Sequence, residues 1–103
     1  MNIIEVNKEN FENEVLKSNI PVLADFNAQW CGPCRSMKPI LEEMAASNPG
    51  YKIVSVDIDD EDELAEEYGI SSIPCLIVFK DGEEINRSIG LISRDAIAEL
   101  MEG

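Results

Sequence analysis

Two patterns of apolar residues alternate along the chain. Residues 20–28 and 51–58 are nearly continuous apolar or β-branched runs, which are typical of strands buried in the middle of a sheet. From residue 31 to about residue 47, apolar residues instead recur every three or four positions, which is typical of an amphipathic helix. A strand, a helix and a second strand in this order predict parallel strands joined by a crossover helix.

Extending this reading predicts nine elements in the order β-α-β-α-β-α-β-β-α. The expected strands are residues 3–6, 20–28, 51–58, 75–80 and 83–90, and the expected helices are residues 7–18, 31–47, 60–68 and a segment from residue 93 onward. Asn7 and Ser93 are residue types that cap helix N-termini, and the Asp-Gly pair at residues 81–82 is typical of a hairpin turn. The fold class is therefore α/β, with a central mixed five-stranded sheet flanked by four helices in a single domain, residues 1–103.

Charge limits the expected partners. The chain has 21 acidic and 8 basic residues, for a formal net charge of −13. Nucleic acids and anionic membranes attract the opposite charge, so neither is an expected partner. The densest acidic run, residues 57–67, fits either a solvated strand end and helix N-terminus or a surface that steers a basic partner. The sequence leaves that choice open.

The compartment expected for this chain is the cytoplasm. Its opening residues, MNIIEVNKEN, lack a basic leader followed by a long apolar run, so no signal peptide is expected. No stretch approaches the roughly 18 apolar residues of a membrane-spanning helix. The three cysteines are too few for a disulfide scaffold.

Cys31 and Cys34 stand two residues apart in the stretch NAQWCGPCR, where they could form a staple, a metal clip or a catalyst. A disulfide between them closes too short a loop to constrain the unfolded chain strongly. A structural metal needs about four ligands, and the chain contains no histidine. Unless Asp25 or another subunit completes that set, a redox-active pair is the favoured interpretation.

The position of the pair predicts two unequal thiols. Cys31 is expected at the start of a helix, where free N–H groups and the helix dipole favour a thiolate, and Cys34 lies one turn further on. Cys31 should therefore attack a substrate disulfide, and Cys34 should resolve the mixed disulfide. Gly32 leaves the approach open, and Pro33 stiffens the first turn without sacrificing a hydrogen bond.

At this point the chain resembles the thioredoxin family over almost its whole length. The stretches ADFNAQWCGPCRSMKPILEEMA and YGISSIPCLIVFKDGEEI, with the glycine of SIGLIS, carry the resemblance. It implies the thioredoxin fold and a monomeric protein disulfide reductase. Such a protein takes electrons from a reductase, which depends on NADPH or on ferredoxin, and passes them to disulfide-containing targets. It binds no cofactor or metal and uses the redox-active disulfide Cys31–Cys34.

Two alternatives remain open beside this resemblance: a thiol oxidase or isomerase, and a thioredoxin-like binding module whose thiols are incidental. The Gly-Pro pair between the cysteines resembles reducing members more than the Gly-His of oxidising relatives. Both cysteines and Asp25 are retained, which argues against a pure binding module.

The resemblance also assigns roles to residues outside the cysteine pair. Asp25 would lie beneath Cys34 and handle its proton, and its apolar surroundings predict a raised pKa unless the side chain turns outward. Pro74 matches the family's cis proline, which opposes the cysteine pair and offers backbone to an extended substrate. An apolar docking surface would comprise Trp30, Gly32, Pro33, Ile73, Pro74, Gly90 and Leu91, although Ile73 and Leu91 also fit an ordinary core.

Three positions depart from the family pattern. Asn27 stands where a tryptophan is usual, and Ser55 where many members carry a lysine near the buried aspartate. Without that lysine, Asp25 should be harder to ionise. Cys75 follows Pro74 where a threonine is common. Cys75 is either a small half-buried strand residue or a regulatory thiol that can be oxidised or form a rival disulfide.

Overall fold

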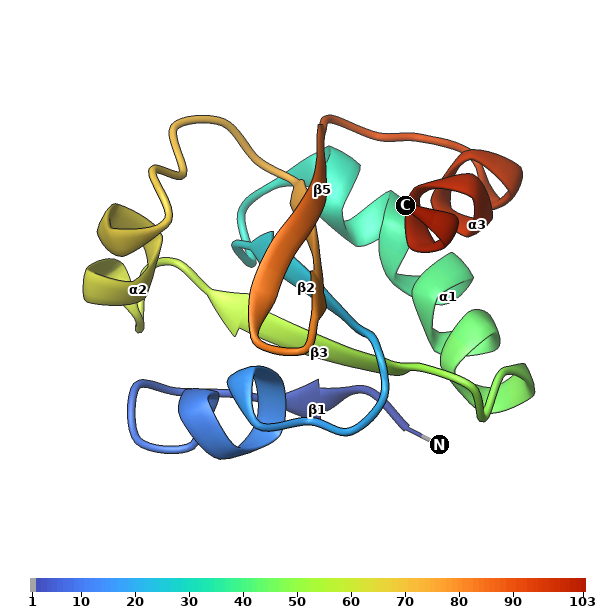
Figure 1. The fold of residues 1–103 in the computed structure, drawn as a ribbon. Coiled ribbons are helices and arrows are strands. Elements are labelled where there is room, and N and C mark those ends of the chain that lie inside the picture. Colours follow the sequence, from blue (N-terminus) through green and yellow to red (C-terminus); the bar gives the residue numbers. More distant parts are fainter. Residues whose placement is uncertain (1) are drawn as a thin grey trace.

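The computed structural model describes residues 2–103 as a mixed five-stranded sheet with helices on both faces (Figure 1). The strands are β1 (Ile4–Glu5), β2 (Val22–Asn27), β3 (Lys52–Asp57), β4 (Cys75–Lys80) and β5 (Glu83–Ile89). The helices are η1 (Glu12–Leu16), α1 (Gly32–Ser47), α2 (Asp62–Glu67) and α3 (Arg94–Glu102). The predicted element order and α/β class are confirmed.

The sheet runs in the order β1-β3-β2-β4-β5. Strands β1, β3 and β2 are parallel, and β4 and β5 are each antiparallel to the neighbour that precedes them in this order. Strand β2 pairs with β3 and β4 along its two edges, and helices cover both of its faces, so its first five residues are buried. This central position explains why the sequence of β2 is almost continuously apolar.

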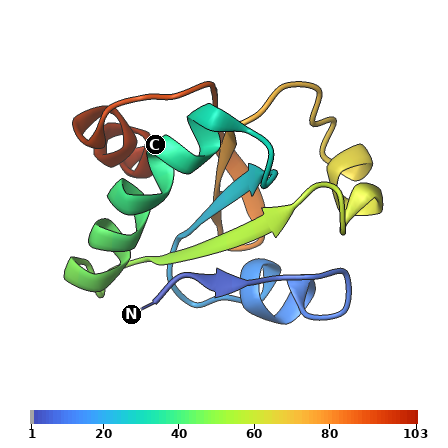
Figure 2. The ribbon, with the colours of Figure 1, turned by 180° about the vertical axis from the view of Figure 1, so that it is seen from behind.

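Alternate side chains of β2 enter two separate hydrophobic cores. Val22, Ala24 and Phe26 pack with residues of η1 and α2 on one face, whereas Leu23 packs with residues of α1 and α3 on the other. Figures 1 and 2 show α1 and α3 lying together on one side of the sheet, away from η1 and α2. Asp25 and Asn27 share the parity of Leu23, so they too face the α1 side.

The hairpin between β4 and β5 turns through Asp81 and Gly82, as the Asp-Gly pair predicted. Both residues have positive φ, 53° and 82°, which is the requirement of a type I′ turn. A Cβ at position 82 would also lie 3.1 Å from the Leu16 carbonyl oxygen, so glycine is favoured there twice over. The turn fixes β5 as the outer strand on this side.

The expected helix at residues 7–18 is wrong in its extent. The Asn7 side-chain oxygen accepts hydrogen bonds from the N–H groups of Glu9 and Asn10, both at 2.9 Å, and its carbonyl accepts from the Phe11 N–H at 3.0 Å. Asn7 therefore caps a first turn, as its residue type predicted. Helix η1 then covers only Glu12–Leu16, with the Lys17 N–H bonded to the Glu12 carbonyl at 2.8 Å. Phe11 and Val15 are buried, so the apolar side of this segment packs into the core.

Two further helices follow the sequence closely. Helix α1 continues unbroken through Pro39, and α3 begins after Ser93, whose hydroxyl accepts the Ala96 N–H at 3.2 Å. Ile97 of α3 is fully buried. Among the helices of residues 2–103, none is long and apolar enough to span a membrane.

Candidate active site

The cysteine pair lies beyond the carboxyl end of β2, where the chain turns into α1. Cys31 and Cys34 form a disulfide with a Cα–Cα separation of 5.2 Å. Cys31 is the N-cap residue of α1, and its Sγ accepts the N–H of Cys34 at 3.2 Å. Both cysteines are 5% exposed and pack with Ala28 and the half-buried Ile58.

The start of α1 favours negative charge on the Cys31 sulfur. Its first turn contains no acidic residue, and Pro33 stands there without needing a hydrogen-bond partner. The free N–H groups and the positive end of the helix dipole therefore act on the Cys31 sulfur without a nearby acidic side chain in the first turn to offset them. The Arg35 guanidinium is held nearby, donating to the Gln29 carbonyl at 2.8 Å. These features stabilise a thiolate once the disulfide is reduced.

Asp25 is buried on the α1 side of the sheet, with only 6% of its surface exposed. Burial raises its pKa from 3.8 to about 7. A hydrogen bond from Asn27 and the positive charge of Lys38 oppose this rise, while the negative charge of Glu5 adds to it. The inward orientation expected from the apolar strand is confirmed, and the direction of the pKa shift agrees with the expectation.

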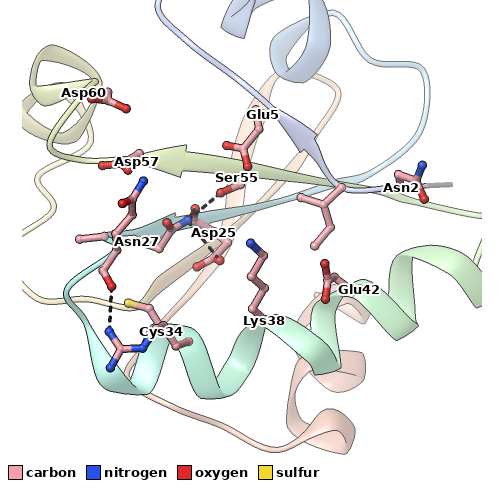
Figure 3. Close-up of a pocket in the computed structure, with 14 residues that line it drawn as sticks. Asn2, Glu5, Asp25, Asn27, Cys34, Lys38, Glu42, Ser55, Asp57 and Asp60 are labelled. Atoms are coloured by element: carbon pink, nitrogen blue, oxygen red, sulfur yellow. Dashed lines mark hydrogen bonds between the residues drawn. The ribbon is translucent and has the colours of Figure 1, made fainter.

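A groove of about 690 Å³ connects Asp25 and Cys34 with solvent (Figure 3). Lys38 extends from α1 into this groove, and Figure 3 shows its amino group turned toward Asp25. The remaining lining residues are Asn2, Ile3, Glu5, Asn27, Ala28, Gln29, Arg35, Glu42, Ser55, Asp57 and Asp60. Because Asp25 and Cys34 line the same groove, water can reach the carboxyl from beside the second cysteine.

Trp30 lies on the surface next to Cys31 and is 66% exposed. Its indole Nε1 donates to the Asp59 carboxylate at 2.8 Å, which fixes the ring despite its exposure. Asp59 was not among the site residues predicted from the sequence. The available signal was topological, because residues that follow β2 and β3 meet at the same edge of a parallel sheet.

The remaining docking residues differ in exposure. Leu91 is 52% exposed, so it is not a core residue, whereas Ile73 is half-buried against the cysteine pair. The Ile73–Pro74 peptide bond is cis, and the buried Pro74 offers its carbonyl to the Gly90 N–H at 2.8 Å. Gly90 has φ +96°, a left-handed conformation that favours glycine. The outer surface also includes Ile89, 58% exposed, which the sequence analysis did not select.

Cys75 is more deeply buried than expected. It is 1% exposed and belongs to the core shared by η1 and α2, together with Phe26 and Phe79. The cysteine pair belongs to a different hydrophobic cluster. Burial also raises the pKa of the Cys75 thiol, which disfavours the reactive thiolate. These features favour a packing role for Cys75.

Replacing Cys75 with serine should lower the free energy of unfolding by about 1–2 kcal/mol, because a hydroxyl replaces a buried thiol. In the native reduced protein, we expect iodoacetamide to leave Cys75 unmodified until denaturant is added, as read by mass spectrometry. Rapid labelling of native Cys75, or lower sensitivity of C75S to inactivation by peroxide, would instead support the regulatory role.

Within residues 2–103, the structure contains no cluster of three or more histidine, cysteine, aspartate or glutamate side chains placed to hold a metal ion. The site therefore consists of a disulfide at a helix N-terminus, a buried carboxyl reached by a groove, and an exposed apolar rim. A fold and site of this kind define a thiol-disulfide oxidoreductase.

Comparisons with known proteins are in agreement. The thioredoxin family model matches residues 2–103. The chain is 47% identical to a thioredoxin of Chlamydia trachomatis, over 93% of this chain and 92% of that relative, and 40% identical to a thioredoxin of Pyropia yezoensis, over 98% and 95%. A mutant thioredoxin from Halobacterium salinarum has a similar structure, with a TM-score of 0.90 and 35% identity, covering 98% of this chain and 88% of that one.

The chain therefore belongs to the thioredoxin family and has the thioredoxin fold. With its cysteine pair joined in a disulfide, it is a protein disulfide reductase. Proteins of this family carry a redox-active disulfide in place of a bound cofactor.

Proposed function

We propose that Cys31 is the nucleophile of this reductase and Cys34 the resolving thiol. In the first step, the Cys31 thiolate attacks one sulfur of a target disulfide, and the other target sulfur leaves as a thiolate and takes up a proton. In the second step, Cys34 loses its proton and attacks the Cys31 sulfur, which releases the second target sulfur. The target gains two electrons, and Cys31 and Cys34 lose two in forming their disulfide.

The observation that carries this assignment is the hydrogen bond from the Cys34 N–H to the Cys31 sulfur at the N-terminus of α1. After reduction, this environment would stabilise the negative charge that an attacking and leaving sulfur needs. Cys34 lies inside the helix on the side of the groove and of Asp25.

Asp25 would take up the proton of Cys34 during resolution. A pKa of about 7 leaves this carboxyl partly ionised at neutral pH, so that it can accept a proton and later release it. The groove shared with Cys34 gives both groups access to water, which could carry the proton between them.

The docking surface for a target would be the rim around Cys31. Trp30, Pro33 and Leu91 supply exposed apolar contacts, and Gly32 leaves room beside the sulfur. The bond from the Gly90 N–H to the Pro74 carbonyl holds this segment in place. Because Pro74 has no N–H and its carbonyl is already bonded, an extended segment of the target would pair with the backbone of the adjacent Ile73, a recurring mode of peptide recognition.

The wider setting of the proposal is a cytoplasmic, monomeric, single-domain reductase. Cytoplasm is a reducing compartment in which an exchanging dithiol, rather than a permanent disulfide, is expected. An enzyme dependent on either NADPH or ferredoxin would return the oxidised pair to the dithiol, and disulfide-containing proteins would be the targets.

A reduction assay tests this function directly. The protein should accelerate the reduction of insulin by dithiothreitol, seen as precipitation of the insulin B chain. Paired assays with an NADPH-dependent and a ferredoxin-dependent reductase would identify the electron donor. A failure to accelerate insulin reduction with either thiols or reductases would favour the binding-module alternative.

The midpoint potential of the pair tests the direction of electron flow. A reductase should have a value near that of thioredoxin itself, about −270 mV, which is taken from the family and not from this structure. A value near the roughly −120 mV of strongly oxidising relatives would support the oxidase alternative.

A further inference from the structure

The side chain of Asn27 links Asp25 to the neighbouring strand (Figure 3). The two N–H bonds of its Nδ2 are shared among three acceptors: the Asp25 backbone carbonyl and the Ser55 Oγ, both at 2.8 Å, and, more weakly, the Asp25 Oδ2 at 3.3 Å. Asp25 and Asn27 lie two residues apart in β2 and so share a face, and Ser55 is the register partner of Asp25 in β3. The sheet itself therefore holds these three residues together.

We propose that Asn27 and Ser55 are positioning residues that orient the Asp25 carboxyl for proton exchange with Cys34. This inference rests on the proposed role of Asp25 and deepens it. Both residues stand at positions where the chain departs from the family pattern. In this chain a neutral amide and a hydroxyl would replace the tryptophan and lysine that are more usual there.

The acceptors around Asn27 fix the orientation of its amide. A backbone carbonyl and an ionised carboxylate can only accept, so the nitrogen and not the oxygen of the amide must face Asp25. The Ser55 Oγ accepts from the same nitrogen and stops the amide from rotating away. A donor held in this way interacts more strongly with the carboxylate than with the neutral acid, and so favours ionisation.

The two oxygens of Asp25 have different surroundings. Oδ2 accepts from Asn27, whereas Oδ1 is buried and has no hydrogen-bond partner among residues 2–103. One oxygen is therefore held by the sheet and the other is left for proton exchange. Cys34 lines the same groove as Asp25, and we assign the exchange to Oδ1.

Several charged groups face Asp25 and must be separated from this effect. Lys38 of α1 favours the ionised carboxyl, and Glu5 of β1 opposes it. The other charged residues that line the groove are Arg35 and Glu42 from α1, Asp57 from β3, and Asp60 from the loop before α2. Because Asn27 and Ser55 are neutral, replacing either one leaves all of these charges in place.

The experiment follows the ionisation of Asp25 by carbon NMR of its carboxyl group in the reduced protein. Asn27→Leu removes the donor at similar size, and should raise the midpoint by about 0.5–1 pH unit. The matched control is Asn86→Leu in β5, which removes a comparable amide bond to the Leu100 carbonyl, at 3.3 Å, far from the groove. N86L should lower stability and leave the Asp25 midpoint unchanged.

Ser55→Ala provides the second variant, and Ser88→Ala in β5 is its matched control. S55A should change the midpoint by less than N27L, because it removes an acceptor that competes for the amide and leaves the amide in place, and S88A should leave the midpoint unchanged. An unchanged midpoint in both N27L and S55A would overturn the inference. Since S55A removes only one hydroxyl, it keeps this test available even where N27L does not fold.

A kinetic measurement separates this inference from the proposed role of Asp25. The rate at which Cys34 resolves a mixed disulfide on Cys31 is followed by stopped flow as a function of pH. In the parent protein, a resolution rate that does not change with pH around the Asp25 midpoint would overturn the proton-transfer role. A profile that follows this midpoint but does not move with it in N27L would overturn the positioning role alone.

Discussion

Replacing Cys31 with serine is expected to lower the rate of insulin reduction by at least about 10³-fold. The serine hydroxyl stays protonated at neutral pH, so the helix N-terminus that stabilises the Cys31 thiolate has no anion to act on. Cys34 cannot take over, since it lies inside α1 rather than at its N-cap and lines the groove rather than the docking rim. Steady-state insulin assays at pH 7 measure this loss.

The third cysteine offers a matched control for this experiment, because C75S introduces the same substitution in the core next to Phe26. C75S should keep the parent rate. Cys34→Ser should show a different defect, with normal attack but accumulation of a mixed disulfide between Cys31 and the target, seen by mass spectrometry. Retention of substantial activity by C31S, or trapping through a sulfur other than that of Cys31, would contradict the assigned roles.

Replacing Asp25 with asparagine is expected to stabilise the protein above pH 7 by about 2–4 kcal/mol. The upper bound follows from the rise in pKa from 3.8 to about 7 on folding, which corresponds to roughly 4 kcal/mol. The lower part of the range allows for the buried amide of the variant, which needs hydrogen-bond partners of its own.

The pH dependence has a definite sign. Between about pH 4 and pH 7, the unfolded chain ionises Asp25 while the folded protein keeps it protonated, so the native state binds more protons. The free energy of unfolding must therefore fall through this window by up to roughly 1.4 kcal/mol per pH unit. Below about pH 4, D25N and the parent protein should differ little through this group.

Urea unfolding of the oxidised protein at pH 4 and pH 8 measures both effects. Glu42→Gln is the matched control, because it removes a carboxylate that lines the same groove but is exposed to solvent. E42Q should change stability by no more than about 0.5 kcal/mol at either pH. If D25N were no more stable than E42Q at pH 8, ionisation of Asp25 would not cost the folded protein any free energy, and the prediction would be wrong.

The main elements and the catalytic motif could be predicted because their signals are local in sequence. The helical spacing of residues 31–47, the Asp-Gly turn and the apolar run around Asp25 each reflect one strand or one helix. The inward orientation of Asp25 followed from the same run, since a strand covered on both faces leaves no outward side.

Contacts between distant segments were not predictable in this way. The bond from Trp30 to Asp59 and the bond from Asn27 to Ser55 both depend on how β2 and β3 pair. Sequence spacing alone does not fix that register. The depth of Cys75 likewise depends on which face of β4 receives η1 and α2. The first regular helix is shorter than predicted, although Asn7 caps the turn that leads into it as expected.

The alternation of side chains along β2 has a consequence for the chemistry. The strand sends Phe26 into the aromatic cluster with Phe11 and Tyr68, and sends its neighbour Asp25 to the groove. A shift of one residue in the pairing of β2 would exchange the faces of Asp25 and Phe26, and would bury the Asp25 carboxyl in the aromatic cluster. The apolar residues of β2 that fix its register therefore also keep the Asp25 carboxyl on the groove side of the sheet.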